Sequence, residues 1–388
     1  MPRDPRIACS PTQPPPSVRT GAVLICPDSY KGTLSALQAA QAIERGVRAA
    51  WPEADIILRP LADGGEGTLE ALLARGGERR SAMVQDPLGR PVAAEWGILA
   101  DGTAVVEMAQ ASGLTLLLES ERDPRAASSY GTGQLLREAI GAGCQRILVT
   151  IGGSATNDGG AGAMQALGAR FLDAGEREIP RGGLALSGLA RIDLARWEGR
   201  EGLSVSVACD VDNPLCGPDG ATHVYGPQKG ASPGMAAELE AAMLNYGRVL
   251  DEAFGSPISD RPGAGAAGGM GAALMAFLGA VIRPGIDVVM DAVGFDEAVR
   301  RAGLVLTGEG KLDAQSLRGK TISGVLRRRQ GKPVMILPGR SELPAAELGA
   351  LAREGVLVCP PDEALARSAG DYALRLELQT RLALLSYG

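Results

Sequence analysis

Five short stretches of the sequence stand out, each next to an expected strand or helix end: four place glycine beside Asp, Glu, Lys or Ser, and the fifth, residues 210–214, carries two Asp and an Asn. Glycine lets the backbone approach a ligand and turn its N–H groups toward a phosphate. Carboxylates in the same loops suit a magnesium ion or a proton-accepting role. One such loop is explained by a turn, but their recurrence favours an enzyme that acts on a nucleotide. The stretches are residues 28–32, 62–68, 152–160, 210–214 and 307–313.

The loop at residues 152–160 carries the strongest signal for an anion site. It follows an apolar run and combines glycine pairs with Ser154 and Asn157 before a glycine-rich helix start. The backbone N–H groups of such a loop bind phosphate readily. A tight turn capped by Ser or Asn is the alternative explanation.

Pairs of carboxylates stand in three of these loops, at places where strands are expected to end. Carboxylates in this position are often catalytic or hold a metal ion, although solvated loop residues have the same appearance. For Lys31 the alternative is likewise a solvated lysine that opens a helix. The acidic residues concerned are Asp63, Glu66, Asp210, Asp212, Glu309 and Asp313.

Two further segments approach known nucleotide-binding motifs but lack the required context. Residues 263–268 have the GxGxxG spacing but follow Asp260-Arg261-Pro262 instead of a strand. Close helix packing, or backbone facing a ligand cleft, explains Gly268 better. Residues 314–321 would form a P-loop if Ala314 were glycine. Lys320 and Thr321 could still meet a phosphate at the start of the following helix.

The composition is that of a globular protein and disfavours several classes. The 388 residues are 45% hydrophobic and 22% charged, and the length suits two domains. Aromatic residues are only 3%, which argues against a β-sandwich and against nucleic-acid binding by base stacking. The net charge of −6 gives no electrostatic footprint for nucleic acid or an anionic membrane. A small anionic substrate remains compatible with it.

The cysteine and histidine content narrows the chemistry further. The six cysteines form no CxxC pair, so we expect buried reduced thiols and a cytoplasmic protein. His223 is the one histidine; we expect it on a strand with a structural role, which leaves acid–base work to Asp, Glu or Lys. Residues 1–20 contain six prolines and predict a disordered extension. No apolar run has the length of a membrane span.

The order of expected elements predicts an α/β protein with a doubly wound parallel layer. Residues 21–80 alternate strands and helices, and buried strands return from residue 304 onward, so this layer uses both ends of the chain. Residues 81–110 predict an antiparallel meander within a mixed α/β insert. Ser232 and Pro233 predict the start of a long helix that ends at Phe254. Strand-end loops of both parts are expected to meet in a ligand cleft.

Taken in order, these segments resemble the bacterial-type glycerate kinases that form 2-phosphoglycerate. The resemblance is collinear from about residue 21 to 340 and weakens afterwards. It implies ATP-dependent phosphorylation of D-glycerate, at C2. It also implies a flavodoxin-like domain at residues 21–80 and 288–388, interrupted by an inserted α/β domain at residues 81–287. The matching segments are residues 27–35, 60–68, 86–89, 152–162, 209–215, 225–230 and 307–320.

Phosphoryl transfer depends on positioning and charge neutralisation, and the site residues are assigned on that basis. Asp210 is the first candidate for the base that takes the C2 hydroxyl proton, Asp313 is the second, and Lys31 neutralises negative charge. Magnesium, bridging the ATP phosphates, is expected at Asp210 and Glu309. The expected substrate- and phosphate-binding residues are Asp28, Ser29, Asp63, Glu66, Gly153, Ser154, Asn157, Asn213, Gly268 and Lys311.

Several alternatives stay open at this stage. A glycerate 3-kinase, or a kinase of another small hydroxy acid, would use the same kinds of loops. A nicotinamide-dependent oxidoreductase would rest on residues 263–268. A non-catalytic module that binds small anions is the third. The expected ligands are D-glycerate, ATP and Mg²⁺, with neither nucleic acid nor membrane as a partner, and a homodimer is left open.

Overall fold

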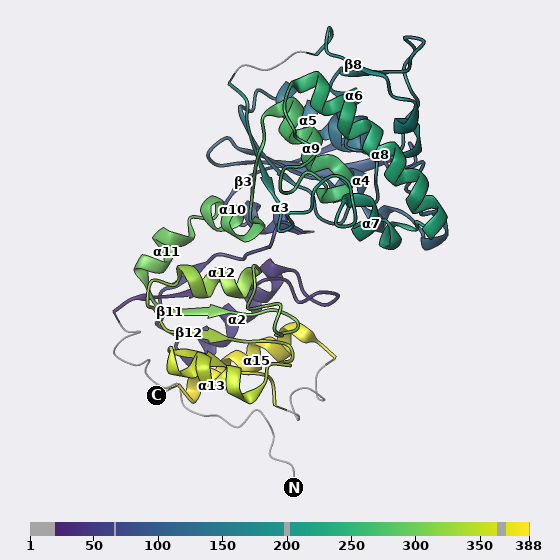
Figure 1. Cartoon of the computed structure of the whole chain (residues 1–388). Helices are drawn as coiled ribbons and strands as arrows, with labels where there is room; N and C mark the ends of the chain where they lie inside the picture. The colour runs from purple at the N-terminus through teal and green to yellow at the C-terminus, as the bar shows by residue number, and fades with distance from the viewer. Residues whose placement is uncertain (1–19, 66, 198–201, 363–369, 388) are drawn as a thin grey trace. The chain divides into compact units, whose positions relative to one another are not determined.

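The computed structural model describes residues 20–65, 67–197, 202–362 and 370–387, which form two compact units (Figure 1). Of these, unit 1 comprises residues up to 63, 70–74 and those from 289 onward; unit 2 comprises the remainder. The expected extension, apart from its last residue, lies outside the described residues, as does Glu66. None of the described helices is both long and apolar enough to span a membrane.

Unit 1 is built on a five-stranded sheet with the strand order β13-β12-β11-β1-β2. All neighbouring strands pair in parallel. Numbered by their order along the chain, the strands lie 2-1-3-4-5 across the sheet, which is the flavodoxin-like order. The predicted flavodoxin-like parallel sheet is therefore confirmed. The strands are β1 (Ala22–Ile25), β2 (Ile56–Leu58), β11 (Ala302–Thr307), β12 (Val334–Ile336) and β13 (Val356–Val358).

Helices cover both faces of this sheet, so its strands are apolar runs instead of alternating ones (Figure 1). On one face, side chains of α2 and α15 such as Ile43 and Leu376 pack on Val23 and Leu304 of the strands. Ser35 starts α2 with a capping box: its side chain accepts the Gln38 N–H, and the Gln38 side chain accepts the Ser35 N–H. The helices are α2 (Ala36–Ala50), α11 (Phe295–Arg301), α12 (Thr321–Arg328), α13 (Ala345–Arg353) and α15 (Tyr372–Leu385).

Unit 2 contains a six-stranded mixed sheet with the order β10-β9-β6-β5-β4-β3. Strands β3, β4 and β5 pair antiparallel, as the predicted meander requires, while β5, β6, β9 and β10 are parallel. A separate hairpin joins β7 and β8. The strands are β3 (Gly77–Gln85), β4 (Pro91–Leu99), β5 (Ala104–Glu107), β6 (Arg146–Thr150), β7 (Arg170–Leu172), β8 (Arg191–Asp193), β9 (Ser204–Ala208) and β10 (Val281–Arg283).

The helices of unit 2 include the long α8, which begins at Pro233 where the sequence predicted it. The Ser232 side chain accepts the Met235 N–H and so caps α8. Helix α9 has three left-handed residues near its start, at 267–269. The helices are α4 (Ala109–Ser112), α5 (Tyr130–Gly141), α6 (Ala161–Ala166), α7 (Ala221–Tyr225), α8 (Pro233–Phe254) and α9 (Ala266–Leu278); α3 (Thr68–Leu73) and α10 (Gly285–Ala292) span the sequence boundaries between units. Short 3₁₀ turns occupy Leu114–Leu116, Glu119–Glu121, Leu184–Gly188 and Pro227–Lys229.

Two observations bear on the expectations for His223 and for the GxGxxG segment. The prediction of a strand around His223 is wrong, because the residue lies in α7, where the neighbours Ala221 and Thr222 are both buried. The β-branched residues suggested a strand, but burial does not alternate along them. Residues 263–268 lead into α9, and no strand occurs in the described residues 255–265. This segment therefore lacks the strand–turn–helix context of a dinucleotide site.

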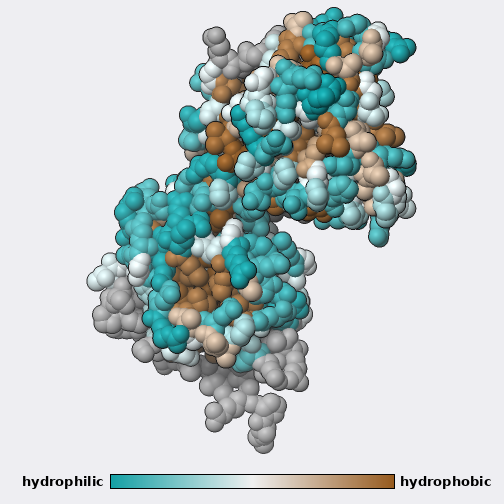
Figure 2. Space-filling view, viewed as in Figure 1, coloured by the Kyte–Doolittle hydropathy of each residue, from teal (hydrophilic) through white to brown (hydrophobic). Residues whose placement is uncertain are grey.

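Figure 2 shows hydrophilic side chains over most of the visible surface of each unit. In unit 1, hydrophobic side chains gather in one area of this face, with hydrophilic side chains around it.

The five cysteines among the described residues are free thiols, and Cys26 is fully buried in the unit 1 core. The other four are half-buried, so the predicted burial holds for Cys26 alone, and the reduced state remains a prediction.

Candidate functional site

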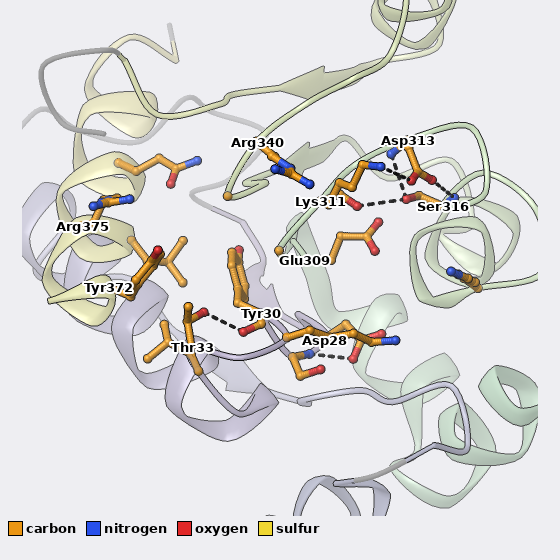
Figure 3. A pocket seen from close by; sticks show the side chains of 18 of the residues that line it. Asp28, Tyr30, Thr33, Glu309, Lys311, Asp313, Ser316, Arg340, Tyr372 and Arg375 are labelled. Atoms are coloured by element: carbon orange, nitrogen blue, oxygen red, sulfur yellow. Dashed lines mark hydrogen bonds and ion pairs between the residues drawn. The ribbon is translucent and has the colours of Figure 1, made fainter. Parts of the chain in front are cut away.

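A pocket of about 630 Å³ lies in unit 1 beside the carboxyl ends of β1 and β11 (Figure 3). These strands are neighbours in the sheet but lie far apart in the sequence. The chain continues to β2 on one side and to β12 on the other, so the pocket sits at the topological switch point of the sheet. Open parallel sheets bind ligands at this position. The pocket is therefore the candidate site of unit 1.

Asp28 stands at the β1 side of this pocket and is held by two hydrogen bonds. Its Oδ2 accepts the Thr321 hydroxyl at 2.5 Å, and its Oδ1 accepts the Ser29 N–H at 2.6 Å. Burial, and then the nearby Asp63 carboxylate, raise the pKa of Asp28, while the Thr321 hydrogen bond opposes the increase. The pocket thus contains acidic groups that repel one another, which favours a bound cation.

Glu309 reaches the pocket from the loop after β11. Burial raises the pKa of Glu309 to about 7, with the Ser316 hydroxyl opposing the increase and the Asp28 charge adding to it. Its Oε1 atom is buried and has no hydrogen-bond partner among the described residues. A buried carboxylate oxygen without a partner costs free energy. It is accordingly a place where a ligand or metal ion would restore a missing interaction.

Lysines and arginines line the same pocket. Lys31 is exposed and Lys320 is half-buried. Lys311 is bound more firmly, since its Nζ lies 2.8 Å from Glu342 Oε2 and 3.2 Å from Asp313 Oδ2. The Lys311 hydrogen bond lowers the pKa of Asp313, whose Oδ1 also accepts the Gln315 and Ser316 N–H groups. Asp313 therefore shapes its own loop and is a weak base.

Tyr30 and Gly308 fix the distance between the two loops of the pocket. The Tyr30 hydroxyl donates a hydrogen bond to the Leu337 carbonyl, and the ring is buried. A Cβ atom on Gly308 would lie 2.3 Å from the Tyr30 hydroxyl oxygen, so no larger residue fits there. This packing holds the loop after β11 against the loop after β1.

In unit 2, the glycine-rich loop after β6 is built around a buried lysine, Lys229. The Lys229 Nζ donates to Ser154 Oγ at 2.8 Å and to the Thr156 carbonyl at 2.7 Å. Burial lowers the pKa of Lys229 to about 7, and the Asp158 charge opposes the decrease. Gly153, in the same loop, is exposed and left-handed, with φ of 73°. The loop is therefore a rigid turn that presents the backbone of Gly153 to solvent.

Asp158 and Asn157 complete the interior of this loop. Asp158 Oδ2 accepts hydrogen bonds from the Ser129 N–H and hydroxyl and from the Gly162 N–H, and Oδ1 accepts the Gly160 N–H. Asn157 Nδ2 donates to Thr222 Oγ1, whereas Asn157 Oδ1 and Thr156 Oγ1 are buried without a partner among the described residues. These hydrogen bonds orient the loop from within unit 2.

The remaining predicted site residues of unit 2 differ in their hydrogen bonds and packing contacts. Asp210 follows β9, is exposed, and accepts the Gly285 N–H on Oδ1 at 2.7 Å. Asn213 donates to the Asp219 carbonyl and accepts the Tyr225 hydroxyl, so its side chain stabilises its own loop. Gly268 packs against the loop after β6, where a Cβ atom would lie 2.0 Å from the Thr156 carbonyl oxygen.

A sequence model of a known protein family matches most of this chain. The sequence model described as "Glycerate kinase family" matches residues 23–370. This chain belongs to the glycerate kinase family. Glycerate 2-kinase of Escherichia coli (strain K12) is 49% identical over 322 residues, which cover 82% of this chain and 84% of that protein. Glycerate kinase of Bacillus subtilis (strain 168) is 48% identical over 318 residues, covering 81% and 83%.

A solved structure supports the same conclusion for this glycerate kinase family member. The crystal structure of a candidate glycerate kinase 2 from Salmonella typhimurium LT2 matches with a TM-score of 0.83 and 41% sequence identity. The match covers 94% of this chain and 98% of that chain. The predicted resemblance to glycerate kinases and the predicted α/β fold class are confirmed.

In each unit of this glycerate kinase family member, the structure brings some of the predicted site residues together. The unit 1 pocket collects Asp28, Ser29, Lys31, Asp63, Glu309, Lys311 and Asp313. The loop after β6 holds Gly153, Ser154 and Asn157, and Gly268 packs on it. Asp210 and Asn213 lie in the segment after β9. The functional role of each residue stays a prediction.

Sequence reasoning missed several residues of these two places. Lys229 was part of a family-like segment, but its burial against Ser154 could not be inferred from spacing. Tyr372 and Arg375 of α15 line the unit 1 pocket although the family resemblance fades before them. The incomplete P-loop pattern pointed to Thr321 as a candidate phosphate contact, but its hydrogen bond to Asp28 was not expected.

The unit 1 pocket fits the magnesium ion that a kinase uses. Among the described residues no three Asp, Glu, His or Cys side chains group closely enough to hold a metal ion by themselves. Magnesium, however, is usually bound by one or two carboxylates together with phosphate oxygens and water. The partnerless Glu309 Oε1, with Asp28 and Asp63 in the same pocket, provides such oxygen ligands.

Proposed function

We propose that this glycerate kinase family member transfers the γ-phosphoryl group of ATP to the C2 hydroxyl of D-glycerate, which gives 2-phosphoglycerate and ADP. ATP-dependent phosphorylation of glycerate follows from its membership of the family. The choice of C2 over C3 is supported by the name of the Escherichia coli relative, glycerate 2-kinase. The observation that carries the proposal is the switch-point pocket of unit 1, which combines carboxylates with lysines.

The unit 1 pocket is proposed as the place of the nucleotide. Magnesium bound with ATP neutralises phosphate charge, and Glu309 with Asp28 supplies oxygen ligands for it. Lys31, which is exposed, and Lys320, which is half-buried, both line the pocket and balance the charge of the phosphates. Lys311 is held by two carboxylates and therefore contributes less to phosphate binding.

Asp210 is proposed as the base that accepts the proton of the C2 hydroxyl. It stands directly beyond a parallel strand, a usual place for catalytic carboxylates in α/β proteins. The Gly285 N–H orients its Oδ1. The second candidate, Asp313, is less suited because Lys311 lowers its pKa and two backbone N–H groups occupy its Oδ1. The earlier assignment of Asp210 as a metal ligand remains a prediction.

The loop after β6 is proposed to bind the carboxylate of glycerate. The left-handed Gly153 exposes its backbone, and the buried Lys229 fixes the loop by hydrogen bonds to Ser154 and to the Thr156 carbonyl. A fixed loop with backbone N–H groups favours a small anion. Asn157 supports this loop from inside. A cytoplasmic location and a homodimer remain predictions.

An assay of ADP release, coupled to a second enzyme and run over a panel of hydroxy acids, tests this function. We expect magnesium-dependent turnover with D-glycerate, and phosphorus NMR of the product should show a secondary phosphate ester at C2. A product phosphorylated only at C3 would refute the choice of hydroxyl. An absence of turnover with D-glycerate would refute the function itself.

A further inference from the structure

We propose that the α15 end of the unit 1 pocket binds the adenine base of ATP, with the Tyr372 ring as its stacking surface. This inference rests on the proposed function, since it concerns the nucleotide of the same reaction. It assigns a role to the C-terminal helix, which the family-like segments do not reach.

The two ends of the pocket differ in chemistry (Figure 3). At one end, Asp28 and Glu309 lie beside the strand ends. At the other, α15 contributes Tyr372 and Leu376 together with the polar Arg375 and Gln379. Thr33 and Leu34 from the β1–α2 loop line the wall as well. A nucleotide has the same division, with charged phosphates at one end and an apolar, planar base at the other.

The size of the pocket also points to a nucleotide. Pockets for small molecules and cofactors usually measure about 300–1,000 Å³, and this one measures about 630 Å³. Glycerate, with three carbon atoms, would fill only a small part of it. ATP is the larger of the two substrates, and its size suits a pocket of this volume.

Tyr372 is arranged as a surface for stacking. The side chain is 45% exposed, in a chain with only 3% aromatic residues. The Arg375 guanidinium lies 4.7 Å from the ring centroid and holds the ring by a cation–π contact. Asp371 caps α15 at this point, because its Oδ1 accepts the N–H groups of Ala373 and Leu374. The ring is therefore fixed by its own helix turn while part of it stays accessible.

Helix α15 itself is anchored to the parallel sheet of unit 1. The buried Gln379 donates from Nε2 to the carbonyls of Pro338 and Cys359, at 3.0 and 2.7 Å. These residues follow β12 and β13. Leu376 is buried in the core together with α2. Tyr372 is thus held on the same rigid scaffold as the charged end of the pocket, as a base-binding surface requires.

Substitution of Tyr372 tests the proposal, with Leu374 as the matched control. Leu374 lies in the same helix turn and is equally exposed, at 45%, but does not line the pocket. Stacking of a base on an aromatic side chain contributes about 1–3 kcal/mol. We therefore expect Tyr372→Ala to raise both the KM for ATP and the calorimetric Kd for a non-hydrolysable ATP analogue by about 5- to 160-fold. The KM for D-glycerate should stay the same, Leu374→Ala should behave like the wild type, and Tyr372→Trp should restore affinity.

The calorimetric arm separates this inference from the proposed function. If the wild type binds the analogue but does not phosphorylate glycerate, the function fails while the Tyr372→Ala result still tests the base site. An unchanged Kd in Tyr372→Ala would overturn the inference, and so would a parallel increase in the KM values of both substrates. Circular dichroism of each variant verifies that the exposed substitution leaves the fold intact.

Discussion

The charged groups of unit 1 and unit 2 are used in opposite ways. In the unit 1 pocket Lys31 is exposed, Lys320 is half-buried, and Glu309 Oε1 has no partner among the described residues. In the unit 2 loop Lys229 is 1% exposed and already bound, and Asp158 accepts four hydrogen bonds. Both units combine glycine, lysine and acidic residues. In unit 1 some of the charged groups remain available to a ligand, whereas in unit 2 they already form hydrogen bonds within the protein. The first arrangement is suited to binding, and the second to holding a loop in place.

The difference explains how a protein with a net charge of −6 can act on anions. Affinity for phosphate depends on local cations and backbone N–H groups instead of the total charge. The lysines that line the unit 1 pocket supply such cations, and the fixed loop of unit 2 supplies an oriented backbone. Both arrangements are compatible with phosphoryl transfer, where positioning and charge neutralisation dominate.

The largest effect is expected for Asp210→Asn. The substitution keeps the volume of the side chain and removes the charge that a base needs. A general base contributes roughly 10²–10⁴-fold in rate, so kcat should fall by that factor while the melting temperature changes little. Steady-state kinetics at saturating ATP and D-glycerate measure the effect. Asp212→Asn is the neighbouring control, because Asp212 is also exposed. Near-wild-type turnover of Asp210→Asn, with loss of activity in Asp313→Asn, would transfer the role to Asp313.

A smaller effect, on stability, distinguishes the fixed loop of unit 2 from an ordinary turn. In Gly268→Ala the new Cβ would lie 2.0 Å from the Thr156 carbonyl oxygen, at a φ of 71°. Gly279→Ala is the matched control, since Gly279 has φ of 60° and open space around it. The control should lose about 1–2 kcal/mol, the cost of a left-handed residue. Gly268→Ala should lose about 1–3 kcal/mol more through overpacking. Urea unfolding measures both, and equal losses would show that the loop yields easily.

The smallest effect concerns the pH dependence of stability caused by Lys229. Burial lowers the pKa of Lys229 to about 7, below the ordinary value of 10.5, so above pH 7 the folded state has lost a proton that the unfolded state retains. The unfolded state then binds more protons, and stability increases with pH, by at most about 1.4 kcal/mol per pH unit from one group. We expect this increment between pH 7 and 9 in the wild type and not in Lys229→Met. Urea unfolding at several pH values gives the difference between the two proteins, which cancels the contribution of the cysteines.

If both proteins showed the same pH slope, Lys229 would not be the group that titrates. The contrast between the charged groups of unit 1 and unit 2 would then weaken, because a lysine that remains charged inside unit 2 could attract a bound anion. A steeper slope in the wild type would instead support the role of Lys229 as an internal brace of the loop.

Much of the fold could be predicted from local sequence. The helix beginning at Pro233 was marked by Ser232, and the parallel strands of unit 1 by short apolar runs. The strand expected at His223 was wrong because propensity over five residues competes with packing against neighbouring helices. The strand order 2-1-3-4-5 depends on contacts between the two ends of the chain, which followed from the resemblance and not from periodicity.

The residue types of the site could be predicted from the sequence, but the hydrogen bonds and ion pairs between them could not. The acidic loops were recognisable, and the structure places Asp28 and Glu309 in one pocket. A carboxylate is available to a ligand only if no other side chain already binds it. Such partners lie far along the chain, as Thr321 does for Asp28, or across a turn, as Lys311 does for Asp313. Tyr372 carried no motif at all, and only the packing of α15 brings it to the pocket.

The most direct test of the account is a calorimetric titration of the magnesium complex of a non-hydrolysable ATP analogue into three proteins. The wild type should bind, and Glu309→Gln, which removes the carboxylate from the unit 1 pocket, should raise the Kd at least 10-fold. Ser154→Ala, which alters the unit 2 loop, should bind the analogue like the wild type. The account is contradicted if Glu309→Gln binds normally while Ser154→Ala loses the nucleotide, because the binding pocket would then not be the one at the switch point of unit 1.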